Sequence, residues 1–157
     1  MSKPAQQIKA HTSEHPVQYD LEGNWVFSVA VLADQVARRV SNIVSEVSDL
    51  NLSHWRVLAA VADKAGRTAS EVVELTPMDK GVVSRAVKHL SDTGLVERRA
   101  CASDGRLSYL FMTDEGYLTY ERIVTALRER GATGESLPNG QALNDALKTM
   151  IASYSEA

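Results

Sequence analysis

The stretch from Thr68 to Gly116 constrains the fold more than any other part of the chain. It predicts a short helix over Ala69–Leu75, which ends before Pro77 because a proline pushes the residue before it out of the helical region. The carboxylate of Asp79 is then placed to cap a second helix, over residues 80–89, by accepting its orphan backbone N–H groups. The segment therefore predicts two helices joined by a tight turn.

The second helix has two unlike faces. Its apolar residues recur at three- and four-residue steps and predict one buried face: Val82, Val83, Ala86, Val87 and Leu90. Its other side carries basic, polar or small residues: Lys80, Gly81, Ser84, Arg85, Lys88 and His89. Gly94 closes the helix as a C-cap. A helix that hides its valines and exposes a cation, a hydroxyl and a small residue near its N-terminus suits the DNA major groove.

A β-hairpin is expected after the second helix. Residues 95–99 and 107–112 are two β-prone runs with rough alternation, and the link between them holds the turn signal Ser103-Asp104-Gly105. Three arginines are expected to cluster at its exposed tip: Arg98, Arg99 and Arg106. Such a ribbon can lie along a phosphate backbone or insert a guanidinium into a narrow minor groove. Asp104 is expected to accept a hydrogen bond from Arg106 and fix its direction.

The predicted order is a helix, a turn and a second helix, followed by GLVERR, a tip with SDGR and then YLFMTDEG. This order resembles the winged helix-turn-helix of the MarR/SlyA family of bacterial regulators. GLVER also occurs in other winged-helix families, so the specific part is D-x-R in the wing with L-x-x-T-x-x-G after it. The resemblance runs from about Leu52 to about Tyr120. It implies that the second helix is the recognition helix, with Ser84-Arg85 at the family's usual Thr/Ser-Arg pair. It also implies that Asp104 and Arg106 are the wing pair, with Arg106 in the minor groove.

The charge distribution agrees with nucleic-acid binding better than the net charge of −3 does. Residues 53–113 carry 9 Lys/Arg against 7 Asp/Glu, whereas the remainder carries 8 against 13. The basic charge is therefore concentrated where the groove-reading parts are expected. Because the field is weak, affinity is expected to depend on a few well-placed contacts rather than on bulk attraction.

Long apolar stripes flank this segment. From Asn24 to Leu50 apolar residues step by three and four, and a helix of about 25 residues with so wide a band is too long to serve only a small winged-helix core. Two further stripes, over residues 117–127 and 143–154, follow the wing. An intertwined twofold dimer would bury these faces and present two recognition helices to an inverted repeat. The MarR resemblance implies the same arrangement.

The expected fold is mainly α with a small β-hairpin wing (α+β), a winged helix-turn-helix whose long flanking helices form an intertwined dimer. We expect an N-terminal arm over residues 1–23, a dimerisation helix over 24–51, a DNA-binding domain over 52–113 and C-terminal dimerisation helices over 114–157.

The resemblance implies a dimeric transcriptional regulator that binds double-stranded DNA at an inverted-repeat operator. In this family such a protein is usually a repressor that a small ligand releases. The family commonly binds aromatic or phenolic acids between the dimer helices and the DNA-binding lobe. Here Arg38 or Arg39 can pair with such a carboxylate, with Trp25 and Ser28 near by. The alternative is a winged-helix module for protein–protein contact without DNA, against which the intact recognition-helix and wing pairs argue.

Other functional classes find no support in the sequence. There is no Gly-rich phosphate loop, no G-x-S-x-G and no H-E-x-x-H, so we expect no catalytic activity, no cofactor and no metal site. Redox sensing at the single cysteine, Cys101, is a further hypothesis, which is disfavoured because peroxide-sensing relatives carry their reactive cysteine near the start of the first long helix, where this chain has none. No apolar run approaches 18 residues, and residues 1–19 lack a signal peptide's apolar block, so a cytoplasmic location is expected.

Overall fold

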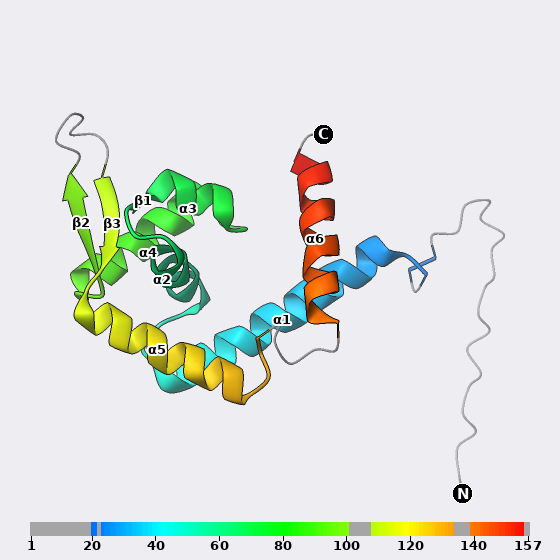
Figure 1. Cartoon of the computed structure of the whole chain (residues 1–157), viewed down its shortest axis with the longest axis horizontal. Coiled ribbons are helices and arrows are strands. Elements are labelled where there is room, and N and C mark those ends of the chain that lie inside the picture. The colour runs from blue at the N-terminus through cyan, green and yellow to red at the C-terminus, as the bar shows by residue number, and fades with distance from the viewer. Residues whose placement is uncertain (1–19, 22, 101–107, 134–138, 156–157) are drawn as a thin grey trace, which may run out of the picture. The chain divides into compact units, whose positions relative to one another are not determined.

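The fold is mostly helical, with one small antiparallel sheet (Figure 1). The computed structural model describes residues 20–21, 23–100, 108–133 and 139–155. The helices of these parts are α1 (Trp25–Val47), α2 (Leu52–Asp63), α3 (Ala69–Leu75), α4 (Lys80–Asp92), α5 (Asp114–Glu129) and α6 (Gly140–Ser155). The strands are β1 (Arg67–Thr68), β2 (Val96–Ala100) and β3 (Ser108–Met112). The predicted fold class, mainly α with a small β-hairpin wing, is confirmed.

Two compact units divide the chain after Ala33, within α1. The described part of the first unit is the beginning of α1 and a few residues before it. Its large apolar side chains are exposed: Leu21, Trp25, Val26, Phe27, Val29, Val31 and Leu32. The second unit, residues 34–157, contains the sheet and the buried hydrophobic cluster.

The helix predicted over Ala69–Leu75 has those bounds in the structure. A reciprocal capping box starts it, because the Thr68 hydroxyl accepts from the Glu71 N–H at 3.2 Å and the Glu71 carboxylate accepts from the Thr68 N–H at 2.7 Å. Asp79 caps α4 as predicted, its carboxylate accepting from the Val82 N–H at 2.8 Å. The helix then runs to Asp92, three residues beyond the predicted end.

A Schellman turn closes α4. Gly94 has a φ of 73°, in the left-handed region that favours glycine. The Leu95 N–H donates to the Leu90 carbonyl at 2.9 Å, and the Gly94 N–H donates to the Ser91 carbonyl at 3.1 Å. The predicted glycine therefore ends the helix, one residue after the Thr93 C-cap.

Thr113 ties the start of α5 to this turn. Its hydroxyl donates to the Gly94 carbonyl at 2.6 Å, and its N–H donates to the Leu95 carbonyl at 3.2 Å. The same hydroxyl accepts from the Gly116 N–H at 3.0 Å and so caps α5. One residue thus joins the end of α4 to the beginning of α5.

The sheet has the order β1-β3-β2, and all its pairs are antiparallel. The two predicted strands form, with β2 displaced by one residue; the predicted start of the second, Leu107, lies outside the described residues. β1 was not predicted. It pairs Arg67 with Leu110 at the edge of the sheet.

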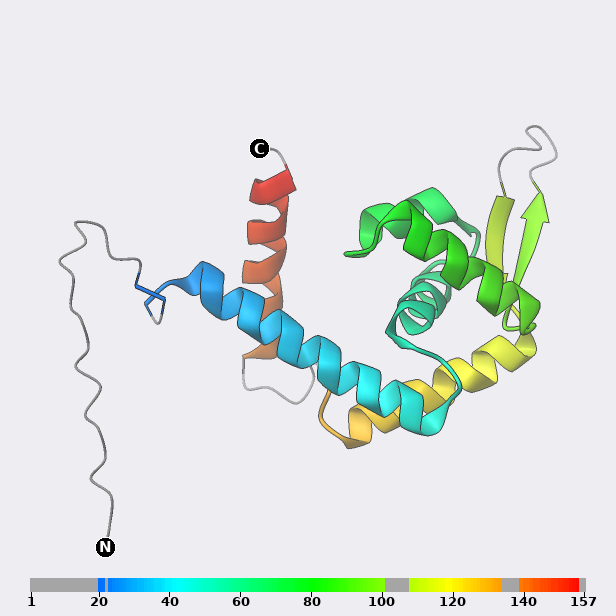
Figure 2. The same cartoon turned by 180° about the vertical axis from the view of Figure 1, so that it is seen from behind.

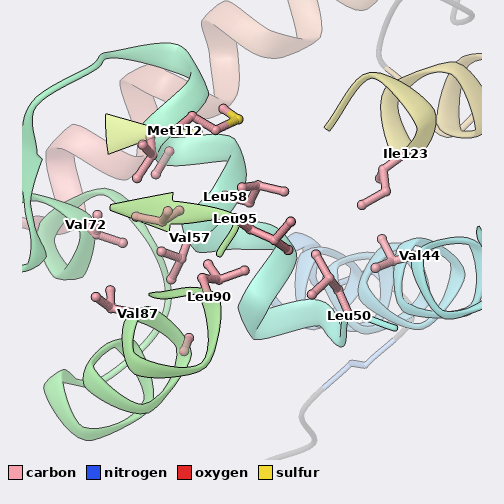
Figure 3. Packing of buried hydrophobic residues seen from close by; sticks show 14 of the residues in the cluster. Val44, Leu50, Val57, Leu58, Val72, Val87, Leu90, Leu95, Met112 and Ile123 are labelled. Carbon is pink, nitrogen blue, oxygen red and sulfur yellow. The ribbon is translucent and has the colours of Figure 1, made fainter. Parts of the chain in front are cut away.

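The core lies in the second unit and draws on α1, α2, α3, α4, the sheet and α5. Val57, Leu90 and Leu95 lie close together at its centre, and Val44 of α1 points toward Ile123 of α5 (Figure 3). α2, which was not predicted from the sequence, packs against both α4 and α5. Figure 2 shows α3 and α4 in front of α2. This packing leaves one side of α4 open to solvent.

Candidate DNA interface

The exposed face of α4 consists of the polar residues expected there. Val83, Ala86, Val87 and Leu90 are buried. Five of the six predicted contact residues are exposed: Lys80, Gly81, Ser84, Arg85 and Lys88. The two faces therefore separate as the spacing predicted.

The cations near the N-terminus of α4 are available to a ligand. Neither Lys80 nor Arg85 forms an ion pair with any residue that the structure describes. A Cβ at Gly81 would lie 3.5 Å from Nη1 of Arg85, so the guanidinium reaches back over the first turn. Lys88 differs, since its ammonium pairs with Asp92 at 2.5 Å.

His89 is half-buried and packs against α2. Its ring stacks on that of His54, with centroids 3.9 Å apart and planes 6° from parallel. Burial, and secondarily the nearby charge of His89, lower the pKa of His54 below its ordinary value. His89 therefore packs between α4 and α2, whereas the other contact residues predicted on this helix are exposed.

The two arginines of β2 do not cluster. Arg98 and Arg99 lie within the strand, opposite Leu110 and Tyr109, and their side chains take opposite faces because a strand alternates. Arg99 lies over the Phe111 ring, 4.3 Å from its centroid, and pairs with Glu97. The expected grouping of Arg98 with Arg99 at the hairpin tip is therefore wrong.

Arg98 instead joins the surface of α4. Its guanidinium donates to the Ser108 hydroxyl at 3.2 Å, and the side chain lines a cavity of about 370 Å³ together with Lys80 and Ser84. Glu74 of α3 lies in the same wall. Asp104 and Arg106, the predicted wing pair, and Cys101 lie outside the described residues.

The arginines predicted to bind an acidic ligand already have partners. Arg38 pairs with Asp34 one turn earlier, and the Arg39 guanidinium donates to the carbonyl of Arg130, the C-cap residue of α5. Arg130 in turn pairs with Glu46. Trp25 and Ser28 are exposed and belong to the first unit.

A second cavity, of about 550 Å³, lies where α1 and α4 end and α5 begins. Of the residues predicted to have a function, only His89 lines it. Its walls come from three segments far apart in the sequence, so no local pattern could have revealed it. Within the described residues no three His, Cys, Asp or Glu side chains are grouped so that they could hold a metal ion. No helix in those parts is long and apolar enough to cross a membrane.

Comparison with known proteins points to one family. A model of the MarR family matches residues 48–107. The HTH-type transcriptional regulator MgrA of Staphylococcus aureus is 26% identical over 141 residues, which cover 88% of this chain and 95% of MgrA. The chain is therefore similar to the MarR family of transcriptional regulators over its central part. The transcriptional regulator HosA of Escherichia coli O157:H7 is 30% identical over 81 residues, a match that spans 52% of this chain and 57% of HosA.

Solved structures share the fold. The transcriptional repressor CouR, bound to a 23-mer DNA duplex, has a TM-score of 0.69 and 22% identity. The match covers 86% of this chain and 94% of CouR. The relatives named here, MgrA, HosA and CouR, are all described as transcriptional regulators or repressors.

Proposed function

We propose that this protein is a homodimeric repressor of the MarR type that binds an inverted-repeat operator and is released by a small effector. The observation that carries the proposal is the exposed surface of α4 around Ser84, where neither Lys80 nor Arg85 has an ion pair with a described residue. An exposed helix with cations and a hydroxyl near its N-terminus suits the DNA major groove. The likeness to CouR, whose structure was solved with a bound DNA duplex, supports the proposal that this protein binds DNA.

The proposed contacts divide between base edges and phosphates. Arg85 reaches a base edge or a nearby phosphate beside Ser84, and Lys80 contacts the backbone. Arg98 is close enough to Lys80 and Ser84 to extend the same surface, whereas Arg99 is held by Phe111 and Glu97. Arg106, aimed by Asp104, is proposed to enter the minor groove.

The dimer is proposed from the exposed apolar side chains of α1 and α6. They include Trp25 and Leu32, each 50% exposed, and Ile151, 66% exposed. Apolar surface on this scale marks an interaction site. We assign residues 24–51 and 114–157 to dimerisation and residues 52–113 to DNA binding, with residues 1–23 as an arm.

Fluorescence anisotropy with a duplex from the gene's own upstream region tests DNA binding. Arg85→Ala should cost about 1–3 kcal/mol per half-site, and Arg106→Ala should lower the salt slope by about one unit per protomer. Lys148→Ala, on α6, removes a charge away from α4 and is the matched control. If the wild-type protein bound operator and scrambled duplexes equally weakly, the protein–protein module would be the better account.

A further inference from the structure

The cavity at the ends of α1 and α4 and the start of α5 has a strongly acidic wall. Glu46, Asp49 and Glu115 line it, whereas Arg122 is its one Lys or Arg. Glu46 is paired with Arg130, but Asp49 and Glu115 have no ion pair with a described residue. Arg122 likewise has no ion pair with a described residue, so the unpaired side chains of the cavity carry one net negative charge.

The backbone contributes negative charge to the same place. α1 ends at Val47 and α4 ends at Asp92, so the partly negative carbonyl ends of two helices meet at the cavity. Neither helix has a lysine or arginine in its last turn to offset this; α4 has only His89 there. The opposite end of α5 also meets the cavity, but Asp114 and Glu115 occupy its first turn. The fixed dipoles and the side chains thus favour a cation.

Thr119 adds a polar group that faces the cavity. It is only 7% exposed and lines the cavity, and its side chain has no hydrogen bond within the described residues. Its oxygen is not among the fully buried side-chain atoms without a partner, so the hydroxyl can be reached from the cavity and can bond to a ligand's polar group. Leu50 and Leu95 give the wall an apolar part. The cavity therefore suits a molecule with both a charged and an apolar end.

We propose that this cavity is the effector site and that it binds a small organic ammonium ion. The ammonium group lies toward Asp49 and Glu115, and the apolar part lies against Leu50 and Leu95. The absence of a three-donor group within the described residues favours an organic cation over a metal ion. This ligand is opposite in charge to the aromatic acid expected at Arg38 or Arg39.

A ligand bound in the cavity can change the position of the recognition helix α4. His89 lies in the last turn of α4 and Thr93 is its C-cap, and both line the cavity. A ligand that fits one position of α4 better than another shifts the population between them. This regulatory step rests on the proposed function, whereas the binding step does not.

Three probes with the same ring separate charge from shape: tryptamine (cation), tryptophol (neutral) and indole-3-acetate (anion). Each is titrated into the full-length protein and followed by ¹H–¹⁵N NMR. Tryptamine should give saturable shifts in residues 45–50, 89–95 and 115–122, and indole-3-acetate should not. Equal or tighter binding of the anion, or no shift with tryptamine at millimolar concentration, would overturn the proposal. Signal loss in the same segments with Mn²⁺ alone would assign the cavity to a metal ion instead.

Charge-neutral variants locate the site. Asp49→Asn and Glu115→Gln should each weaken tryptamine binding by roughly fivefold, the loss expected for one partly exposed charge pair. Glu121→Gln, on an exposed part of α5 outside the cavity, is the matched control and should leave binding unchanged. If Glu121→Gln weakened binding as much as the two cavity variants, the effect would be one of general charge and the site would be rejected.

Operator anisotropy with tryptamine present tests the regulatory step. Tryptamine should weaken operator binding by the same factor by which operator weakens tryptamine binding. NMR shifts without any operator binding by the free protein would refute the proposed function but leave the cation site intact. Operator binding that tryptamine leaves unchanged, together with NMR shifts, would refute only the effector role.

Discussion

Single residues fix the junctions of this fold, and Gly116 is the tightest of them. A Cβ at this position would press into the Leu95 carbonyl oxygen and lie 2.6 Å from Cγ of Met112. Gly94 differs: a Cβ there meets nothing within 4 Å, and only its φ of 73° resists a side chain. The two glycines therefore serve different physical needs.

Gly116→Ala should lower the free energy of unfolding by about 3 kcal/mol, because the backbone must move to admit the methyl group. Gly94→Ala should cost about 1–2 kcal/mol, the penalty of a left-handed residue. Urea denaturation of both variants measures the two losses. A larger loss for Gly94→Ala would show that steric contact is not what requires glycine at position 116.

The stacked histidines should make stability depend on pH. The pKa of His54 is lowered by burial, with the nearby charge of His89 as the second cause, so the folded state binds its proton less readily than the unfolded state. His54 therefore contributes fully to the free energy of unfolding above its ordinary pKa of 6.5, and this contribution is lost as the pH falls through the lowered pKa.

His54→Gln should reduce the fall in the free energy of unfolding between about pH 7 and about pH 5. The His54 Nδ1 accepts from the Asn51 N–H at 3.4 Å, and glutamine can accept the same bond, so the cap of α2 should survive. Urea unfolding at a series of pH values is the measurement. An unchanged pH slope in this variant would mean that other groups cause the acid sensitivity.

The sequence predicted elements where the signals are local. Asp79 and Gly94 mark the ends of α4 because caps act within one turn. The stacking of His54 on His89 joins residues far apart in the sequence, and no periodicity reports such a contact. α2 was not predicted because the residues from Val57 to Val61 form an apolar run. Such a run is equally typical of a buried helix and of a buried strand, so its periodicity does not decide between them.

β1 was missed because two residues carry no alternation. The structure holds it through Arg67, whose side chain is 14% exposed. Its Nε donates to the Ala60 carbonyl at 2.9 Å, and its guanidinium pairs with Asp63. The strand is thereby attached to the last turn of α2.

Arg67→Ala should lower the free energy of unfolding by about 1–2 kcal/mol, because the Ala60 carbonyl loses a charged donor. Arg67→Lys keeps the charge but not the forked geometry, so it should recover only part of that loss. Chemical denaturation compares the three proteins. If the lysine variant matched the wild type, the charge alone would account for the contact.

At the scale of the whole molecule, we propose that the apolar face of α1 determines assembly. Val29 and Leu32 lie on it with Trp25 and Val36, at helical spacing, and all are exposed in the single chain. The sequence indicated this face because periodicity reports which residues share a side. It could not name the contacts across a dimer, which depend on a second copy.

The protein should sediment as a dimer of about 34 kDa, twice the chain mass of 17.1 kDa, under twofold pairing. Val29→Glu with Leu32→Glu should give monomers, because two carboxylates would be buried without partners. Gln35→Glu adds a charge at an already polar position of α1 and should remain dimeric. Analytical ultracentrifugation distinguishes these cases, and a stable wild-type monomer would refute the dimer.

The junction at Thr113 has a consequence for the spacing of the operator. Because this residue holds the carbonyls of both Gly94 and Leu95, a tilt of α5 must carry the end of α4 with it. In the proposed dimer each recognition helix is therefore oriented by the C-terminal part of its own chain. One inserted base pair between half-sites turns the second site by about 35° around the DNA axis. Because hydrogen bonds hold the junction of α4 and α5, we expect that this junction cannot bend to follow the rotation of the second half-site. The length of the spacer between the half-sites should therefore be part of what the protein recognises.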